Sequence, residues 1–290
     1  MIIKTQAIAL KISPFSETSR VVVWLTAEHG KIATIIKGAQ RPRNFFLGQY
    51  DLFYTCELLF YLRVFHGLHI VKECCPLKTR AAFRSYWPGT ACASYFAGLA
   101  ARIAPFYAPQ PNLYPLLETA LDIFMEPPAA NMRGGQALAV SLFWFELKLL
   151  GAMGFAPRLN ACLQCRRILP LAAPGRGNGS IAFSAARGGV FCDQCAGQHK
   201  NDSIRIMPDR LALLKFWQSS RNIQAARNAV CTEHQLKDVR VMLGAFLQYH
   251  LETENSGRDI ALSLLKKRRE RDGQAGPGGA GNPLVMKPAD

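Results

Sequence analysis

The chain has 290 residues, of which 49 % are hydrophobic, so it is long enough for two or three domains and too apolar for wholesale disorder. Its 35 Lys and Arg residues outnumber 20 Asp and Glu residues, and the net charge of +15 predicts a polyanionic partner, nucleic acid before an anionic membrane surface. The nine cysteines are odd in number, and no secretory leader or membrane-spanning run is apparent, so we expect a cytoplasmic protein without disulfides.

Residues 1–77 are expected to form a nucleic-acid-binding β-barrel. Five runs in this region are rich in β-branched and aromatic residues, and Gly-containing or polar turns separate them. The predicted strands are residues 2–12, 20–26, 31–36, 49–64 and 68–75. Five short strands of this kind favour a Greek-key barrel, and the OB-fold is the commonest five-stranded barrel that binds oligonucleotides.

Residues 78–265 change to helical spacing and are expected to form an α-helical domain. Apolar residues recur at helical intervals in the segments 78–106, 112–126, 133–154, 208–219, 232–252 and 258–269, with breaks at Pro88, 105–111 and 127–128. The irregular segment 155–200, with a flexible insertion at 173–180, is interpreted as a module within this domain. Residues 266–290 are basic and then Gly-rich, which predicts a disordered tail. The fold class is therefore α+β with several domains.

Two C-x2-C pairs give the strongest chemical signal: Cys162 with Cys165, and Cys192 with Cys195. Four thiolates make the closed tetrahedral shell that structural zinc prefers, so we predict one structural Zn²⁺ per chain. A thiol redox pair is the alternative, and His199 is a further candidate ligand in place of one cysteine. A closed shell leaves no position for a substrate, so the zinc prediction does not imply catalysis.

No motif predicts an enzyme. The sequence lacks a phosphate-binding P-loop, a dinucleotide-binding Gly motif, a zinc-protease H-E-x-x-H and a G-x-S-x-G nucleophile elbow. An H-x-E motif is present at His250–Glu252, but in zinc deaminases this motif precedes the cysteine pair, and here it follows both pairs. We therefore expect a protein without catalytic activity.

The segment KGAQRPRNFF, residues 37–46, predicts a DNA-binding loop after the third strand. A site for single-stranded nucleic acid needs cations along the phosphates and flat rings on which bases stack, at about 1–3 kcal/mol per base. The candidate DNA-binding residues are Lys37, Arg41, Arg43 and Phe45 in this loop, with Arg20 and Lys31 nearby. In the alternative interpretation, Phe45 and Phe46 fill the barrel core; the sequence leaves that choice open.

Four stretches together resemble the RecO family of bacterial recombination mediators. They are AIALKISPFSETSRVVVWLTAEHGKIATIIKGAQRPRNFF near the start, Gly67-Leu68-His69, the cysteine segments GFAPRLNACLQC and FSAARGGVFCDQC, and YHLETENSGRDIALSLL near the end. The resemblance covers about residues 1–265. The residues Asn44-Phe45-Phe46 and the Gly-rich tail depart from the family pattern.

The resemblance implies an N-terminal OB-fold, an α-helical domain and a zinc module held by Cys162, Cys165, Cys192 and Cys195. It also implies binding of single- and double-stranded DNA through Lys37, Arg41 and Arg43, annealing of complementary strands, and loading of RecA onto strands coated with the single-stranded DNA-binding protein SSB. The implied partners are RecR, SSB and, in some members, RecF, at the bacterial nucleoid. An adaptor that binds RNA through the same two modules is the alternative function.

Overall fold

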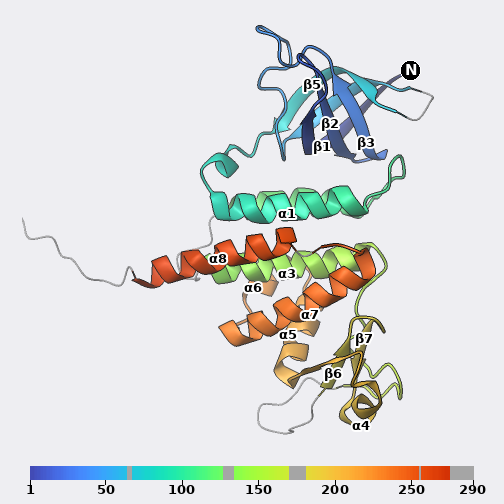
Figure 1. Ribbon diagram of the computed structural model, residues 1–290, viewed down its shortest axis with the longest axis vertical. Coiled ribbons are helices and arrows are strands. Elements are labelled where there is room, and N and C mark those ends of the chain that lie inside the picture. Colours follow the sequence, from blue (N-terminus) through green and yellow to red (C-terminus); the bar gives the residue numbers. More distant parts are fainter. Residues whose placement is uncertain (64–66, 127–133, 170–180, 255, 275–290) are drawn as a thin grey trace, which may run out of the picture.

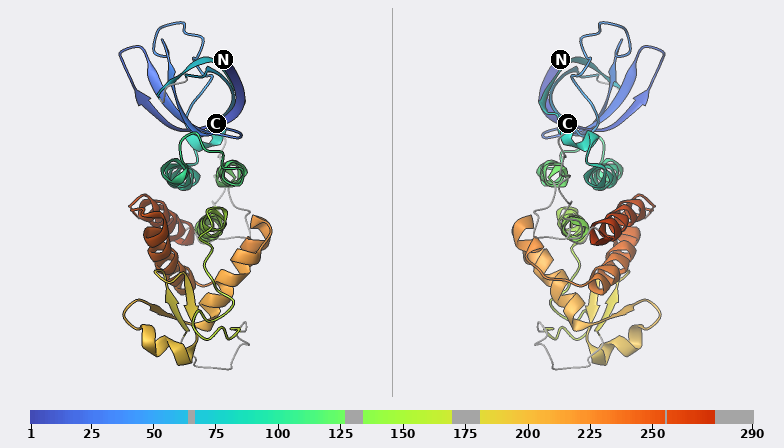
Figure 2. Two further views of the ribbon diagram at one scale, coloured as in Figure 1. Left: turned by 90° about the vertical axis from the view of Figure 1, so that its right-hand side faces the viewer. Right: turned by 90° about the vertical axis from the view of Figure 1, so that its left-hand side faces the viewer.

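The computed structural model of the protein describes residues 1–63, 67–126, 134–169, 181–254 and 256–274. The predicted insertion at 173–180 and the predicted tail after 274 lie outside these residues. The molecule is elongated, with a β-barrel at one end, a layer of helices in the middle and a small sheet at the other end (Figure 1). Two side views show the same order along the long axis (Figure 2).

The barrel confirms the predicted N-terminal five-stranded sheet. Its strands are β1 (Ile2–Pro14), β2 (Arg20–Thr26), β3 (Gly30–Ile36), β4 (Thr55–Tyr61) and β5 (His69–Lys78). They close in the order β1-β2-β3-β5-β4, and only the pairing of β3 with β5 is parallel. Inside the barrel, the buried indole N–H of Trp24 donates to the Thr34 hydroxyl at 2.8 Å, so a polar group in the barrel core is satisfied.

The helices agree with the predicted segments except in several details, among them two short helices within the segment 155–200. They are η1 (Ala81–Arg84), α1 (Trp87–Ile103), α2 (Leu113–Met125), α3 (Gly134–Ala152), α4 (Asp193–Ala196), η2 (Gly197–His199), α5 (Pro208–Ser219), α6 (Ile223–Arg227), α7 (Glu233–Leu251) and α8 (Ser256–Gln274). Pro88, predicted to break a helix, lies in the first turn of α1, where its missing N–H has no helical partner to lose. Helix α6 was not predicted, and α8 continues past residue 266, where the tail was expected to begin.

A continuous apolar core joins the three parts of the molecule. It includes Ile8 and Leu25 from the barrel, most of α3, and Phe183 and Val190 from the small sheet. At the centre of the helices, a buried ion pair links α3 to α8: the Arg258 guanidinium donates to both carboxylate oxygens of Glu146, at 2.7 and 3.0 Å. The barrel is therefore attached to the helices by packing as well as by the chain.

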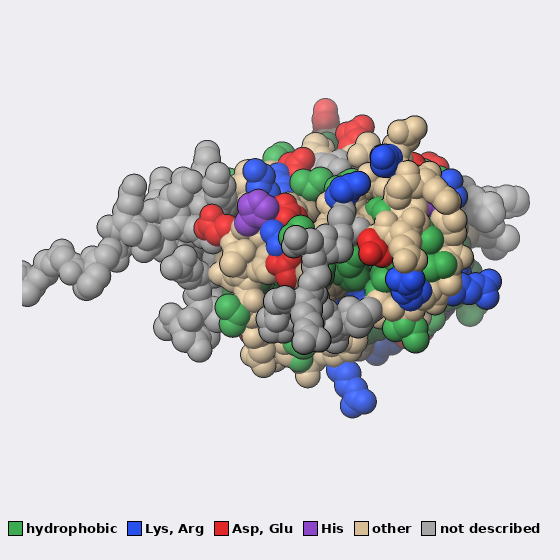
Figure 3. All heavy atoms as spheres, turned by 90° about the horizontal axis from the view of Figure 1, so that it is seen from below, with side chains coloured by type: hydrophobic (Ala, Val, Ile, Leu, Met, Phe, Trp, Pro, Cys, Tyr) green, Lys and Arg blue, Asp and Glu red, His purple; other side chains and the backbone are tan. Residues whose placement is uncertain are grey.

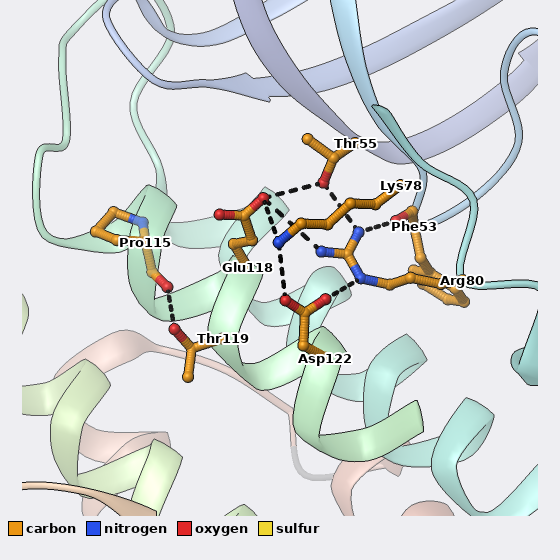
Figure 4. A network of polar contacts seen from close by, with 8 residues as sticks. All are labelled: Phe53, Thr55, Lys78, Arg80, Pro115, Glu118, Thr119 and Asp122. Atoms are coloured by element: carbon orange, nitrogen blue, oxygen red, sulfur yellow. Dashed lines mark hydrogen bonds and ion pairs between the residues drawn. The ribbon is translucent and has the colours of Figure 1, made fainter. Parts of the chain in front are cut away.

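Polar contacts reinforce the junction between the barrel and helix α2 (Figure 4). The buried Arg80 side chain donates to the Phe53 carbonyl at 2.6 Å, to the Thr55 hydroxyl at 2.9 Å and to the Asp122 carboxylate at 2.7 Å. Lys78 is half exposed and lies 3.0 Å from the same Asp122 carboxylate. One guanidinium thus connects the end of β5, the start of β4 and the face of α2.

Two strands of a small sheet lie in the segment 155–200, which was predicted to be irregular, so that prediction was wrong in part; the third strand follows this segment. Strands β6 (Ile181–Ser184), β7 (Gly189–Phe191) and β8 (Ile204–Ile206) pair antiparallel in the order β7-β6-β8. A Cβ atom at Gly189 would lie 2.4 Å from the Arg158 carbonyl oxygen, so only glycine permits this close approach.

No helix within the described part of the chain is long and apolar enough to cross a lipid bilayer.

Candidate nucleic-acid interface and metal centre

The basic loop after β3 lies against the turn between β1 and β2. The Gln40 N–H donates to the Thr18 carbonyl at 3.0 Å, which holds the loop and the turn together. Gly38 has a φ of 68°, a conformation that glycine adopts at no steric cost, and the chain reverses there. We call residues 15–20 and 37–47 together the barrel tip.

Four of the predicted DNA-binding cations are exposed at the barrel tip: Lys37, Arg41, Arg43 and Arg20. Among the described residues, none of the four forms an ion pair with a carboxylate. Burial raises the pKa of the Tyr50 hydroxyl, and the charge of Arg20 partly opposes this shift. The tip holds one exposed carboxylate, Glu17, against these four cations, so it presents a net positive charge to solvent.

Phe45 and Phe46 point in different directions. Phe45 is 95 % exposed, whereas Phe46 is partly buried against the barrel core. The Asn44 side chain fixes this arrangement, since it accepts from the Phe46 N–H at 2.9 Å and donates to the Arg41 carbonyl at 2.8 Å. Phe46 thus fills the end of the barrel, and Phe45 stands free in solvent beside the cations.

Sequence reasoning missed two further apolar side chains at the barrel tip. Phe15, in the turn between β1 and β2, is 57 % exposed, and Leu47 is 76 % exposed. The available signal for Phe15 was a large ring inside a short turn whose other side chains are polar. With Phe45, these side chains give the tip apolar surface as well as charge.

Lys31, predicted as a DNA contact, lies elsewhere, and we remove it from the candidate interface. Its ammonium donates to the Ala101 carbonyl at 2.6 Å and lies 4.3 Å from the centre of the Phe106 ring. The residue is only 8 % exposed, and burial lowers the pKa of its ammonium. The Tyr107 N–H donates to the Lys31 carbonyl at 2.9 Å, so both backbone and side chain connect the barrel to the chain after α1.

The four predicted zinc ligands come together at the opposite end of the molecule. The sulfur atoms of Cys162, Cys165, Cys192 and Cys195 all lie within 4.8 Å of one another, and the Cys165 and Cys192 sulfurs are 3.7 Å apart. A tetrahedral zinc ion with Zn–S bonds of about 2.3 Å places its sulfurs about 3.8 Å apart. The spacing therefore fits a single four-coordinate metal ion.

Backbone geometry sets the positions of the two cysteine pairs. The Leu163 N–H donates to the Val190 carbonyl at 2.9 Å, which holds the first pair against β7. The second pair begins at the end of β7 and continues into α4, where the Cys195 N–H donates to the Cys192 carbonyl at 3.1 Å. Strand β7 thus positions both pairs, although they are 26 residues apart in the chain.

The thiols of the cluster differ in acidity because their surroundings differ. Burial raises the pKa of Cys162, but backbone N–H groups around the sulfur outweigh it and lower that pKa to about 6. Desolvation and the neighbouring sulfurs raise the pKa of Cys195 to about 12. The four sulfurs are so crowded that a divalent cation would stabilise the fully deprotonated set.

His199 does not belong to the cluster. Its ring stacks on Phe191, with the ring centres 4.0 Å apart, and its Nε2 atom forms a hydrogen bond with the Gln164 amide oxygen at 2.8 Å. The candidate metal centre is therefore a set of four cysteines, and the histidine supports the first cysteine pair from outside.

Comparisons with known proteins point to one family over most of the chain. The family model described as recombination protein O, N terminal, matches residues 1–80, and that described as recombination protein O, C terminal, matches residues 85–258. Similar proteins include the DNA repair protein RecO of Anaeromyxobacter dehalogenans, 30 % identical over 86 % of this chain and 91 % of the relative. The DNA repair protein RecO of Bacillus subtilis is 27 % identical over 75 % of this chain and 77 % of the relative. The chain therefore belongs to the RecO family of DNA repair proteins.

Proposed function

We propose that this protein is a non-catalytic mediator of DNA repair and homologous recombination. In this proposal it binds single- and double-stranded DNA at the barrel tip, anneals complementary strands and helps to load RecA onto SSB-coated single strands. Membership of the RecO family supports the role in repair. A closed barrel of five strands is also what an OB-fold requires, so the strand order supports that assignment.

The observation that carries the proposal is the barrel tip itself. Three exposed cations, Lys37, Arg41 and Arg43, lie within seven residues beside a phenylalanine that is almost fully exposed. The Phe45 ring does not pack against the rest of the free protein, so both of its faces are open. Unpaired bases stack on exposed aromatic rings of this kind. Cations without acidic partners lose no ion pair when they bind phosphate, so their full charge is available to the backbone of DNA.

The rest of the molecule has supporting roles in this proposal. The helices provide surfaces for RecR, SSB and, where it takes part, RecF, in the cytoplasm at the nucleoid. Cys162, Cys165, Cys192 and Cys195 hold one structural Zn²⁺ per chain. When bound, the ion cross-links the two cysteine pairs and stabilises the small sheet, because its binding free energy adds to the free energy of folding.

The direct test measures how the affinity for a single-stranded oligonucleotide depends on salt. Each phosphate that the protein neutralises lowers the slope of log K against log salt by about 0.7. Replacement of Lys37, Arg41 and Arg43 by alanine is therefore expected to reduce the magnitude of the slope by about 2. Fluorescence anisotropy with a labelled oligonucleotide, repeated at several salt concentrations, gives the slope for each variant.

A matched control removes three exposed positive charges elsewhere, with Lys4, Lys72 and Lys237 replaced by alanine. It lowers the net charge by the same amount and should leave the slope nearly unchanged. An equal effect of both triple variants would mean that net charge, and not the barrel tip, governs binding. Competition between DNA and RNA oligonucleotides of one length tests the alternative, since a preference for RNA would favour an RNA-binding adaptor.

A further inference from the structure

The end of the molecule that carries the cysteine cluster is also basic. Between residues 155 and 206, the described residues include six Lys and Arg against two Asp. A zinc ion with four thiolates carries a charge of −2. This segment therefore stays positive even with the metal bound, and the metal centre does not account for all of its cations.

Three of these cations surround the cysteine pairs. Arg166 and Arg167 directly follow Cys165, and Lys200 follows His199, whose ring is bonded to the first pair. All three side chains are exposed. Among the described residues, Arg166 and Lys200 form no ion pair. Arg167 forms one long ion pair, with its guanidinium 4.0 Å from the carboxylate of Asp193. We call Arg166, Arg167 and Lys200 the distal basic surface.

Exposed amide side chains join these cations across the two cysteine pairs. The Gln164 amide donates to the Gln198 oxygen at 2.7 Å, and the Arg167 guanidinium donates to the Gln194 oxygen at 2.7 Å. Arg and Lys side chains, and amides such as those of Gln, contact phosphate and sugar oxygens without reading sequence. Viewed from this end, Lys and Arg side chains are spread over the face, with Asp and Glu side chains beside some of them (Figure 3).

The distal basic surface and the barrel tip are at opposite ends of the long axis, with the helical layer between them (Figures 1 and 2). A short oligonucleotide held at the tip therefore does not reach the other end. Two binding surfaces placed in this way hold two separate strands, or two distant segments of one strand.

We propose that the distal basic surface is a second binding site for single-stranded DNA, so that one chain holds two strands at once. This inference rests on the proposed binding of DNA at the barrel tip. Two strands bound to the same protein molecule meet at an effective concentration, commonly in the millimolar range. The length of flexible DNA between each binding site and the point of pairing sets this concentration. The second site thus raises the chance that complementary strands meet, without any new contact to the bases.

A bridging experiment with the full, zinc-loaded chain tests the inference. One oligonucleotide is immobilised, the protein is added, and capture of a second, labelled oligonucleotide is measured; the two sequences cannot pair. The wild type is expected to capture the second strand. The variant in which Arg166, Arg167 and Lys200 are replaced by glutamine should still bind the first strand but lose most of the capture. The control with Lys4, Lys72 and Lys237 replaced by glutamine should capture like the wild type.

Residual binding gives an independent readout. In the variant lacking Lys37, Arg41 and Arg43, most of the remaining affinity for single strands should come from the distal basic surface. Adding the three distal substitutions should remove most of that affinity and of its dependence on salt. Zinc content and thermal unfolding of each variant establish that the cysteine module is intact.

The outcomes separate this inference from the proposed function. If the wild type binds one strand and never captures a second, the distal site is refuted and binding at the tip stands. Capture by the distal variant at the wild-type level would also refute it, because bridging would then come from two tips of associated chains. Failure of the wild type to bind even the first strand would instead overturn the proposed function.

Discussion

Replacement of Arg80 by methionine tests how the barrel is attached to the helices. The Arg80 side chain is 1 % exposed and donates to Phe53, Thr55 and Asp122 across the junction (Figure 4). Methionine keeps much of the apolar stem but leaves the Phe53 carbonyl without this donor. An unsatisfied buried acceptor costs about 1–3 kcal/mol, and a hydrogen bond to a charged group contributes about 1.5–3 kcal/mol.

Because Asp122 is partly exposed and keeps its contact with Lys78, the loss should be smaller than that for a fully buried ion pair. We expect the free energy of unfolding to fall by about 2–4 kcal/mol. For a chain of this size, that corresponds to a decrease in Tm of roughly 4–16 °C. Urea unfolding followed by circular dichroism gives the free energy, and a thermal scan gives Tm.

Lys78 provides the matched control, since it contacts Asp122 and Glu118 from the solvent side, at 3.0 and 3.3 Å. Its side chain is 46 % exposed, and an exposed ion pair contributes about 0–1 kcal/mol. The Lys78→Met variant should therefore unfold close to the wild type. If Arg80→Met were no less stable than Lys78→Met, the buried guanidinium would not be what holds the junction, and apolar packing alone would have to account for it.

Three further predictions concern the core, the metal centre and the tip. Arg258→Ala leaves the buried Glu146 carboxylate without its ion pair and should lower the free energy of unfolding by about 3–5 kcal/mol. The control Arg240→Ala breaks an exposed ion pair with α8 and should lower it by about 0–1 kcal/mol. Equal losses in urea unfolding would contradict this prediction. Elemental analysis should find one zinc per chain, and strong chelation should lower Tm; metal-free protein with unchanged melting would refute the zinc assignment. Phe45→Ala should weaken binding to single strands by about 1–3 kcal/mol per stacked base without changing the salt slope; unchanged affinity would exclude stacking there.

The barrel was predictable from sequence because its signals are local. Each strand contains β-branched and aromatic residues, and turns with Gly or polar residues separate them, so all five strands were predicted. Four were placed within a few residues of their true ends, whereas the fourth was expected from residue 49 and begins only at Thr55. The ligand cluster was predictable for the same reason, since a C-x2-C pair fixes its own geometry. The three-stranded sheet was missed because β7 and β8 have only three residues each, and β8 pairs with β6 across the second cysteine pair.

Lys31 shows where local signals fail. Its sequence neighbours are those of any cation at the start of a strand beside a glycine turn. Its burial comes from Ala101 and Phe106, 70 or more residues away in the chain, which meet the barrel only in the folded protein. The sequence also could not show which of Phe45 and Phe46 is buried, because two adjacent phenylalanines give the same local pattern in either case. Asn44 decides between them through hydrogen bonds that no sequence pattern reports.

The shared core gives the two proposed DNA sites a fixed relation. Ile8 and Leu25 of the barrel, the buried length of α3, and Phe183 and Val190 beside the cysteine cluster belong to one apolar cluster. A flexible linker would let the sites approach each other, whereas a packed core resists such movement. The separation of two bound strands is then set by the helices, so annealing should depend on strand length whereas capture should not. Strands too short to span the helical layer should be captured together but should not anneal faster.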